Sequence, residues 1–140
     1  MTNATTSLNE QATFELYEPS DNAQVVFTAR KMLAGMGFDP TRQYLIASAV
    51  SELSTNIIRY AQKGKVTLNV IHNGDKAGFQ VHAQDQGPGI SDMDKAMKEN
   101  YSSGNGLGLG LPSVKRIMDE FQIQSAPGEG TRITAIKWMD

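Results

Sequence analysis

The sequence predicts a two-layer α/β sandwich (α+β), in which helices cover one face of a mixed, mostly antiparallel sheet of about five strands. Two kinds of pattern predict this fold. Apolar residues that alternate with polar ones are typical of half-buried strands, whereas apolar residues that recur every three or four positions are typical of amphipathic helices. The order strand, two helices, two strands, helix and two strands favours a sheet with a helical layer packed against it.

The first elements are a strand and a helix. Residues 1–11 are polar, and we expect them to be flexible. Alternation over residues 12–18 predicts a strand, and residues 19–21 predict a turn and a helix cap. The helix that follows is expected to end at Gly37. Its apolar stripe consists of Val25, Ala29, Leu33 and Met36.

The second helix carries the first candidate site residues. Asp39 is expected to cap it, with Pro40 in its first turn. Its core stripe consists of Ile46, Val50, Leu53 and Ile57. Glu52 and Asn56 lie one turn apart on the flank of this stripe, because the helix advances about 100° per residue. A ligand cavity along the edge of the core would place two polar side chains in this way.

A β-hairpin is expected next. A turn around Gly64 leads into a strand with Val66, Leu68 and Val70 on one face, and residues 73–75 form the hairpin turn. The partner strand places Phe79, Val81 and Ala83 on one face, and Asp85 falls on the same face. A buried carboxylate needs a partner. Alternatively, the strand ends first and Asp85 caps a turn, because Gly87 follows closely.

The remainder of the chain predicts a helix and two strands. Residues 90–105 are polar, with one short helical pattern. The last helix begins inside a glycine run, with Pro112 in its first turn and the stripe Leu111, Val114, Met118 and Phe121. Ile123 belongs to the following strand, residues 127–130 form a turn, and the final strand brings Thr131 into phase with Ile133 and Ala135.

Six of the thirteen glycines fall between Gly87 and Gly110. Glycine weakens helices and strands, so such a cluster indicates a backbone that approaches something other than protein. Backbone N–H groups exposed in this way bind anions, above all phosphate. The familiar phosphate loops do not fit, because a P-loop needs Lys-Ser or Lys-Thr after its last glycine, where this chain has Leu111 and Pro112.

Together the motifs are consistent with a purine nucleotide site. Asp85 would accept a hydrogen bond from an exocyclic amino group such as that of adenine, while Gly87 and Gly89 would let the base approach the backbone. The phosphates would face the N–H groups at the start of the last helix. The glycines of that segment are Gly106, Gly108 and Gly110. A lone Gly-x-Gly pair is usually a turn, so the inference depends on the combination.

Two polar residues of the second helix could serve a metal ion and a proton transfer. Asn56 would offer an amide oxygen to Mg²⁺, which prefers oxygen ligands and keeps several waters. Glu52 could take a proton from an attacking hydroxyl or water. Taken alone, Glu52 is more simply an exposed helix charge and Asn56 a polar helix residue. The three motifs in this order favour a site.

Composition excludes several classes of protein. The chain of 140 residues has the length of one domain, residues 1–140, and contains no cysteine for disulfides or thiolate metal sites. A net charge of −2 argues against a nucleic-acid-binding domain. The sequence has neither an apolar stretch of membrane-spanning length nor a basic-then-apolar leader. We therefore expect a cytoplasmic protein without a membrane or nucleic-acid partner.

Four segments resemble the motifs of the GHKL ATPase superfamily, which includes gyrase, the histidine kinases and MutL. These are Glu52–Asn56, Asp85–Gly89, Gly106–Gly110 and Gly128–Thr131, similar to the N-box, the adenine box, the second glycine box and the last box. The resemblance implies the Bergerat fold, ATP and Mg²⁺ as ligands, and a nucleotide contact for Thr131. It runs from about Phe14 to the C-terminus.

Within this superfamily the chain is most similar to the small bacterial serine/threonine kinases that include the anti-sigma factors and the stressosome switch kinases. That similarity implies phosphorylation of STAS-domain partners and activation of a PP2C-type phosphatase. Two hypotheses follow: a protein kinase acting on a partner chain, or a nucleotide-sensing module that sequesters or activates a partner with little turnover. Glu52 favours the kinase, because a pure binding domain needs no base there.

Overall fold

A computed structural model describes residues 11–87 and 110–139. The described chain forms five strands and three α-helices, with one π-helical turn that continues the second helix. The elements are β1 (Gln11–Leu16), α2 (Ser20–Met36), α3 (Pro40–Asn56), η1 (Ile57–Ala61), β2 (Gly64–Asn73), β3 (Lys76–Asp85), α5 (Leu111–Ile117), β4 (Glu120–Ser125) and β5 (Thr131–Trp138).

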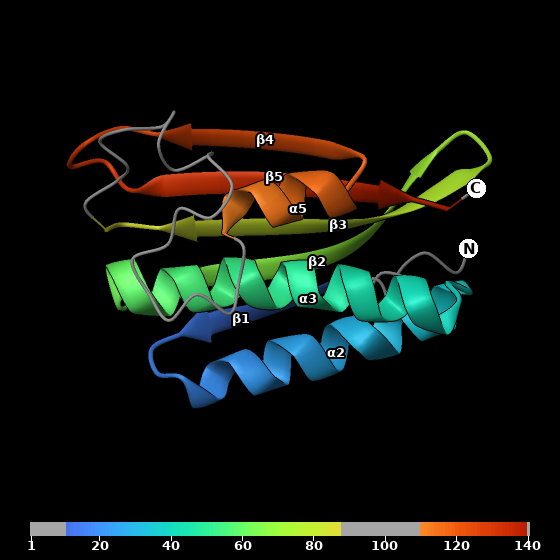
Figure 1. Cartoon of the computed structure of the whole chain (residues 1–140), viewed down its shortest axis with the longest axis horizontal. Helices are drawn as coiled ribbons and strands as arrows, with labels where there is room; N and C mark the ends of the chain where they lie inside the picture. Colours follow the sequence, from blue (N-terminus) through green and yellow to red (C-terminus); the bar gives the residue numbers. More distant parts are fainter. Residues whose placement is uncertain (1–10, 88–109, 140) are drawn as a thin grey trace, which may run out of the picture.

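The strands form one sheet in the order β1-β2-β3-β5-β4, and the helices lie over one of its faces (Figure 1). This confirms the predicted two-layer sandwich. All four neighbouring pairs in the described chain are antiparallel, so the expected mixture of parallel and antiparallel strands is wrong. The hairpin turn between β2 and β3 requires these strands to run antiparallel, and β5 also pairs with β3 in the antiparallel direction.

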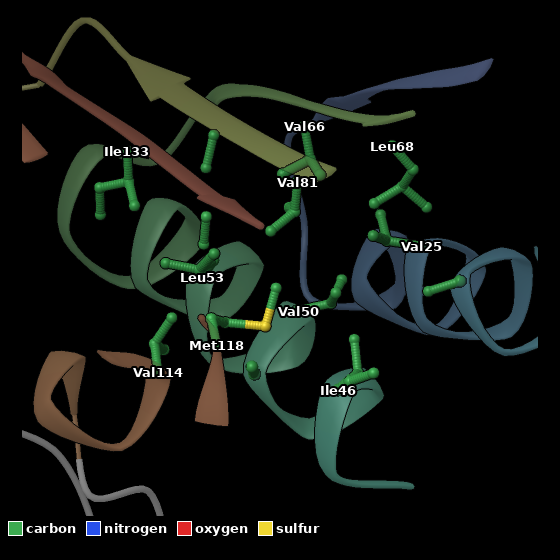
Figure 2. Packing of buried hydrophobic residues seen from close by; sticks show 14 of the residues in the cluster. Val25, Ile46, Val50, Leu53, Val66, Leu68, Val81, Val114, Met118 and Ile133 are labelled. Atoms are coloured by element: carbon green, nitrogen blue, oxygen red, sulfur yellow. The ribbon is translucent and has the colours of Figure 1, made fainter. Parts of the chain in front are cut away.

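The core fills the space between the sheet and the helices (Figure 2). Every residue of the predicted α3 stripe is buried. The sheet contributes the buried side chains Val66, Leu68, Phe79, Val81, Ala83, Ile133 and Ala135. The apolar alternation of each predicted strand therefore marks the face that packs against the helices.

Local signals correctly placed α3 and the β2–β3 hairpin. The carboxylate of Asp39 accepts a hydrogen bond from the Arg42 N–H at 2.9 Å, as an N-cap should. Gly74, with φ +64°, lies in the two-residue loop between β2 and β3. Gly37, with φ +103°, ends α2 as expected.

Two expectations near the ends of helices are corrected. No side chain caps α2; instead the Asp21 carboxylate accepts hydrogen bonds from the Tyr17 and Glu18 N–H groups. The residue with positive φ before β2 is Gln62, whereas Gly64 belongs to β2. The flexible segment expected over residues 1–11 lies outside the described residues except for Gln11, which belongs to β1.

The last helix is shorter than its apolar stripe predicted. α5 ends at Ile117, and Phe121 lies in β4 opposite Ala135. The Asp119 N–H donates to the Ile136 carbonyl at 2.8 Å, so sheet pairing takes over directly after the helix. Phe121 still packs against the core, because the turn from helix to strand keeps it on the inner side.

Candidate functional site

The site residues of α3 lie where the sequence placed them. Glu52 and Asn56 are both half-buried on the flank of the buried stripe. Asn56 is the last residue of α3, and η1 begins directly after it. Figure 1 shows this end of α3, the end of β3 and the start of β5 at the same end of the molecule. Register places Asp85 of β3 directly opposite Thr131 of β5.

Burial raises the pKa of the Glu52 carboxyl, and the opposing positive charge of Arg59 only partly offsets this effect. A carboxylate with a raised pKa holds a proton more tightly than an ordinary one. This property suits a group that must accept a proton from a hydroxyl during a reaction. Glu52 therefore has the electrostatic character of a general base as well as the expected position.

The raised pKa of Glu52 has a measurable consequence for folding. The folded state holds this proton more tightly than the unfolded state, so the free energy of unfolding falls as pH rises through the unfolded and then the folded pKa. At a pH below both pKa values, Glu52 is protonated in both states and does not lower the free energy of unfolding. We expect Glu52→Gln to be more stable relative to the wild type at pH 7 than at pH 4. Urea unfolding at both pH values measures the difference, and an unchanged difference would contradict the raised pKa.

A π-helical turn, η1, follows the α3 site residues and leads into β2. Just before this turn, the Thr55 hydroxyl bonds the Ser51 carbonyl at 2.8 Å and the Glu52 carbonyl at 3.2 Å. Hydroxyl bonds of this kind compete with the helix ladder and bend helices. At its far end the turn brings Ala61 against Gly87. Such turns are frequent at functional sites, and nothing in the sequence pattern predicted this one.

Asp85 lies in phase with the buried face of β3 and also caps the turn that follows the strand. It is the last residue of β3, opposite Thr131 and in phase with the buried Ala83. Its Oδ1 also accepts a hydrogen bond from the Gly87 N–H at 2.8 Å, which caps the turn after the strand. Within the described chain, Oδ2 accepts no hydrogen bond. A half-buried carboxylate held in this way can offer its second oxygen to a ligand.

Two glycines let separate segments close around Asp85. A Cβ at Gly87 would lie 2.6 Å from the Ala61 Cβ, so Gly87 is required for packing against η1. Gly130 has φ +81°, and a Cβ there would overlap the Asp85 carbonyl oxygen. These contacts are with protein, and the expected approach of a base to Gly87 stays a prediction. The sequence places Gly130 in the segment similar to the last box but does not predict its contact with Asp85, which is 45 residues away in the chain.

Gly130→Ala should destabilise the protein and disturb Asp85. A side chain is strained at this φ, and it would also collide with the backbone of β3. Gly128→Ala is the matched control, because Gly128 has φ +80° but open space around it. We expect Gly130→Ala to lower the free energy of unfolding by at least about 1 kcal/mol more than the control. Equal losses in denaturant titrations would show that the contact is unimportant.

Of the remaining predicted site residues, Gly110 and Thr131 lie in the described part of the chain. Gly110 is the N-cap of α5, with φ +72°, and its carbonyl accepts hydrogen bonds from the Ser113 N–H and hydroxyl. Thr131 begins β5 opposite Asp85, and its Oγ1 lies 2.8 Å from the hydroxyl of Ser125. The predicted site residues Gly89, Gly106 and Gly108 lie outside the described residues.

The described side chains suit Mg²⁺ only if a bound nucleotide and water supply further oxygen ligands. Among residues 11–87 and 110–139, no group of three or more His, Cys, Asp or Glu side chains could hold a metal ion. Asn56 offers one hard amide oxygen beside the half-buried Glu52. Mg²⁺ commonly takes few protein ligands and completes its shell with phosphate oxygens and water. The residues present therefore fit a magnesium ion that arrives with a nucleotide.

Comparisons with known proteins show the family of the chain. Residues 17–137 match the family described as histidine kinase-like ATPase domain. The chain is 41% identical to serine/threonine-protein kinase RsbT of Bacillus subtilis, over 94% of this chain and 99% of that protein. It is 31% identical to the anti-sigma F factor of a Thermoanaerobacter species, over 79% of this chain and 83% of that protein.

A solved structure extends the likeness to the fold. A chain of the SiaB–SiaC complex from Pseudomonas aeruginosa superposes with a TM-score of 0.58 at 14% identity, over 99% of this chain and 96% of that chain. At this identity the match concerns the arrangement of the elements alone. None of the helices in the described part of the chain is long and apolar enough to cross a membrane.

Proposed function

The chain belongs to the family of histidine kinase-like ATPase domains, and from this premise we propose that it is an ATP- and Mg²⁺-dependent serine/threonine protein kinase. One observation carries the proposal: the 41% identity to a serine/threonine-protein kinase, which extends over 99% of that relative. The half-buried Glu52 with its raised pKa supports the same conclusion. A domain that only binds nucleotide needs no such base.

We assign the site residues by their chemistry. Asp85 and Thr131 receive the adenine, and Asn56 holds Mg²⁺ together with phosphate oxygens. The glycine run, which includes Gly110, receives the phosphates, and Gly87 shapes the turn beside the base. Gly89, Gly106 and Gly108 keep the nucleotide-binding roles predicted from the sequence.

Glu52 acts on the hydroxyl of the partner protein. The hydroxyl oxygen of a serine or threonine forms a bond to the γ-phosphorus, and Glu52 takes the hydroxyl proton. The bond between this phosphorus and the β–γ bridging oxygen breaks, and its electron pair leaves with ADP. Positioning and charge stabilisation supply most of the acceleration in phosphoryl transfer, so the base contributes only part of it.

The partners that we propose are STAS-domain proteins, which the kinase phosphorylates in the cytoplasm. In the released state it would bind and activate a PP2C-type phosphatase, as in a stressosome switch. Similarity to a serine/threonine-protein kinase and to anti-sigma F factors supports a partner-switching protein of this kind. The net charge of −2 gives no support to a nucleic-acid partner.

An anti-sigma factor is the second candidate function. The 31% identity to an anti-sigma F factor, over 83% of its length, favours it. In this role the chain would sequester a partner and respond to the bound nucleotide, with phosphotransfer slow or absent. Glu52 would then be a structural residue of α3.

Phosphotransfer to candidate partners tests the two functions. The full chain is incubated with ATP labelled in the γ-phosphate, Mg²⁺ and purified STAS-domain proteins. We expect label on a serine or threonine of one partner and none when Mg²⁺ is removed by a chelator. Stable association with a partner and no labelling would favour the sequestering module instead.

A further inference from the structure

A polar contact joins the first turn of α2 to the turn of α3 that carries Glu52. The Asn22 side chain donates from Nδ2 to the Ser51 hydroxyl oxygen at 3.2 Å, and its Oδ1 accepts a hydrogen bond from the Ser54 hydroxyl. Figure 1 shows the start of α2 beside the end of α3. Ser54 is fully buried, and a buried hydroxyl requires a hydrogen-bond partner. Asn22 therefore ties α2 to α3 at a point inside the core.

This contact holds a turn of α3 in which hydroxyl groups compete for the backbone carbonyls. The Ser54 hydroxyl lies 3.3 Å from the Ser51 carbonyl oxygen, and the Thr55 hydroxyl donates to the same oxygen at 2.8 Å. Hydroxyl groups that bond carbonyls of the preceding turn compete with the helical hydrogen bonds. The helix then changes to the π-helical turn η1. A contact from a separate helix thus adds support where the backbone of α3 is least regular.

Glu52 lies between the two residues that Asn22 contacts, but on another side of the helix. Two residues advance an α-helix by about 200°, so Glu52 and Ser54 point in nearly opposite directions. Asn22 therefore reaches α3 from the side away from the Glu52 carboxylate. Hydrogen bonds to two residues one turn apart resist rotation of the helix about its axis, and this rotation determines where the carboxylate lies.

We propose that Asn22 is a positioning residue for phosphotransfer, which holds this turn of α3, through Ser51 and Ser54, in the rotation that presents Glu52 to the partner hydroxyl. The inference rests on the proposed function, because it requires Glu52 to act as the base. A displacement of about 1 Å at a reacting group can slow a reaction about 100-fold. Loss of the Asn22 contacts should therefore slow the proton transfer without removing any group that touches the substrate.

The test measures single-turnover transfer of labelled phosphate from saturating ATP and Mg²⁺ to a partner protein. We expect Asn22→Ala to lower the rate by about 10- to 100-fold. In a Glu52→Gln background the same substitution should change the remaining rate by less than about twofold, because the base that it would misplace is already absent. Gln24→Ala is the matched control, because Gln24 is exposed on the same helix.

The two backgrounds distinguish positioning of Glu52 from a general structural role. A merely structural Asn22 would lower the rate by the same factor in both, and that result would overturn the inference, as would an unchanged rate in folded Asn22→Ala. If this variant does not fold, Ser54→Ala removes one of the two hydrogen bonds with little change in volume and should show the same dependence on Glu52. Equal losses in both backgrounds would again be decisive against the inference. A wild-type chain that labels no partner would overturn the proposed function as well.

Discussion

Glu52→Gln should retain ATP binding and lose phosphotransfer by about 10²- to 10⁴-fold, the range for removal of a general base. The amide keeps the size of the half-buried side chain but cannot accept the proton of the substrate hydroxyl. Single-turnover transfer of labelled phosphate to a partner protein measures the loss, and calorimetry measures ATP affinity. The variant isolates the proton transfer, because Glu52 lies a helical turn from Asn56 and on a different element from Asp85.

Glu18→Gln is the control for this experiment. Glu18 is an exposed carboxylate between β1 and α2 with no predicted role in the site, and its replacement changes the net charge equally. Full phosphotransfer by Glu52→Gln would mean that Glu52 is structural. Loss of ATP binding in the same variant would instead assign Glu52 to the nucleotide site rather than to the partner hydroxyl.

Asp85→Asn should weaken ATP binding by about 10- to 150-fold, because hydrogen bonds to a charged group contribute about 1.5–3 kcal/mol. An amide cannot satisfy both neighbours. If its oxygen continues to accept from the Gly87 N–H, its NH₂ group faces the adenine amino group, donor against donor. If the amide is reversed, the same conflict arises at Gly87.

The matched control for Asp85→Asn is Asp75→Asn. Asp75 is exposed in the β2–β3 turn, so its replacement removes the same charge far along the strand from the site. Calorimetric titration with ATP and Mg²⁺ compares the two variants. Unchanged affinity in Asp85→Asn would remove Asp85 from the adenine site.

Features set by neighbours in the chain were predictable from the sequence. The cap at Asp39, the stripe of α3 and the flanking positions of Glu52 and Asn56 follow from helical periodicity alone. The phase of Asp85 follows from alternation along β3. These elements are also those that carry most of the candidate site, which is why the site could be outlined before the structure.

Features set by long-range pairing were not predictable. The stripe from Val114 to Phe121 suits a helix, but pairing of β4 with β5 ends α5 at Ile117 and makes Phe121 a strand residue. The contact of Gly130 with Asp85 and the bond of Ser125 to Thr131 depend on which strands are neighbours. Strand order does not follow from periodicity, so contacts between residues of different strands could not be predicted from the sequence.

The most direct measurement is a crystal structure of the full chain with Mg²⁺ and a non-hydrolysable ATP analogue. We predict the adenine amino group at Asp85 and Thr131, and the metal ion at Asn56 beside Glu52. An analogue bound at any other place, with Asp85 left without a ligand, would contradict the account.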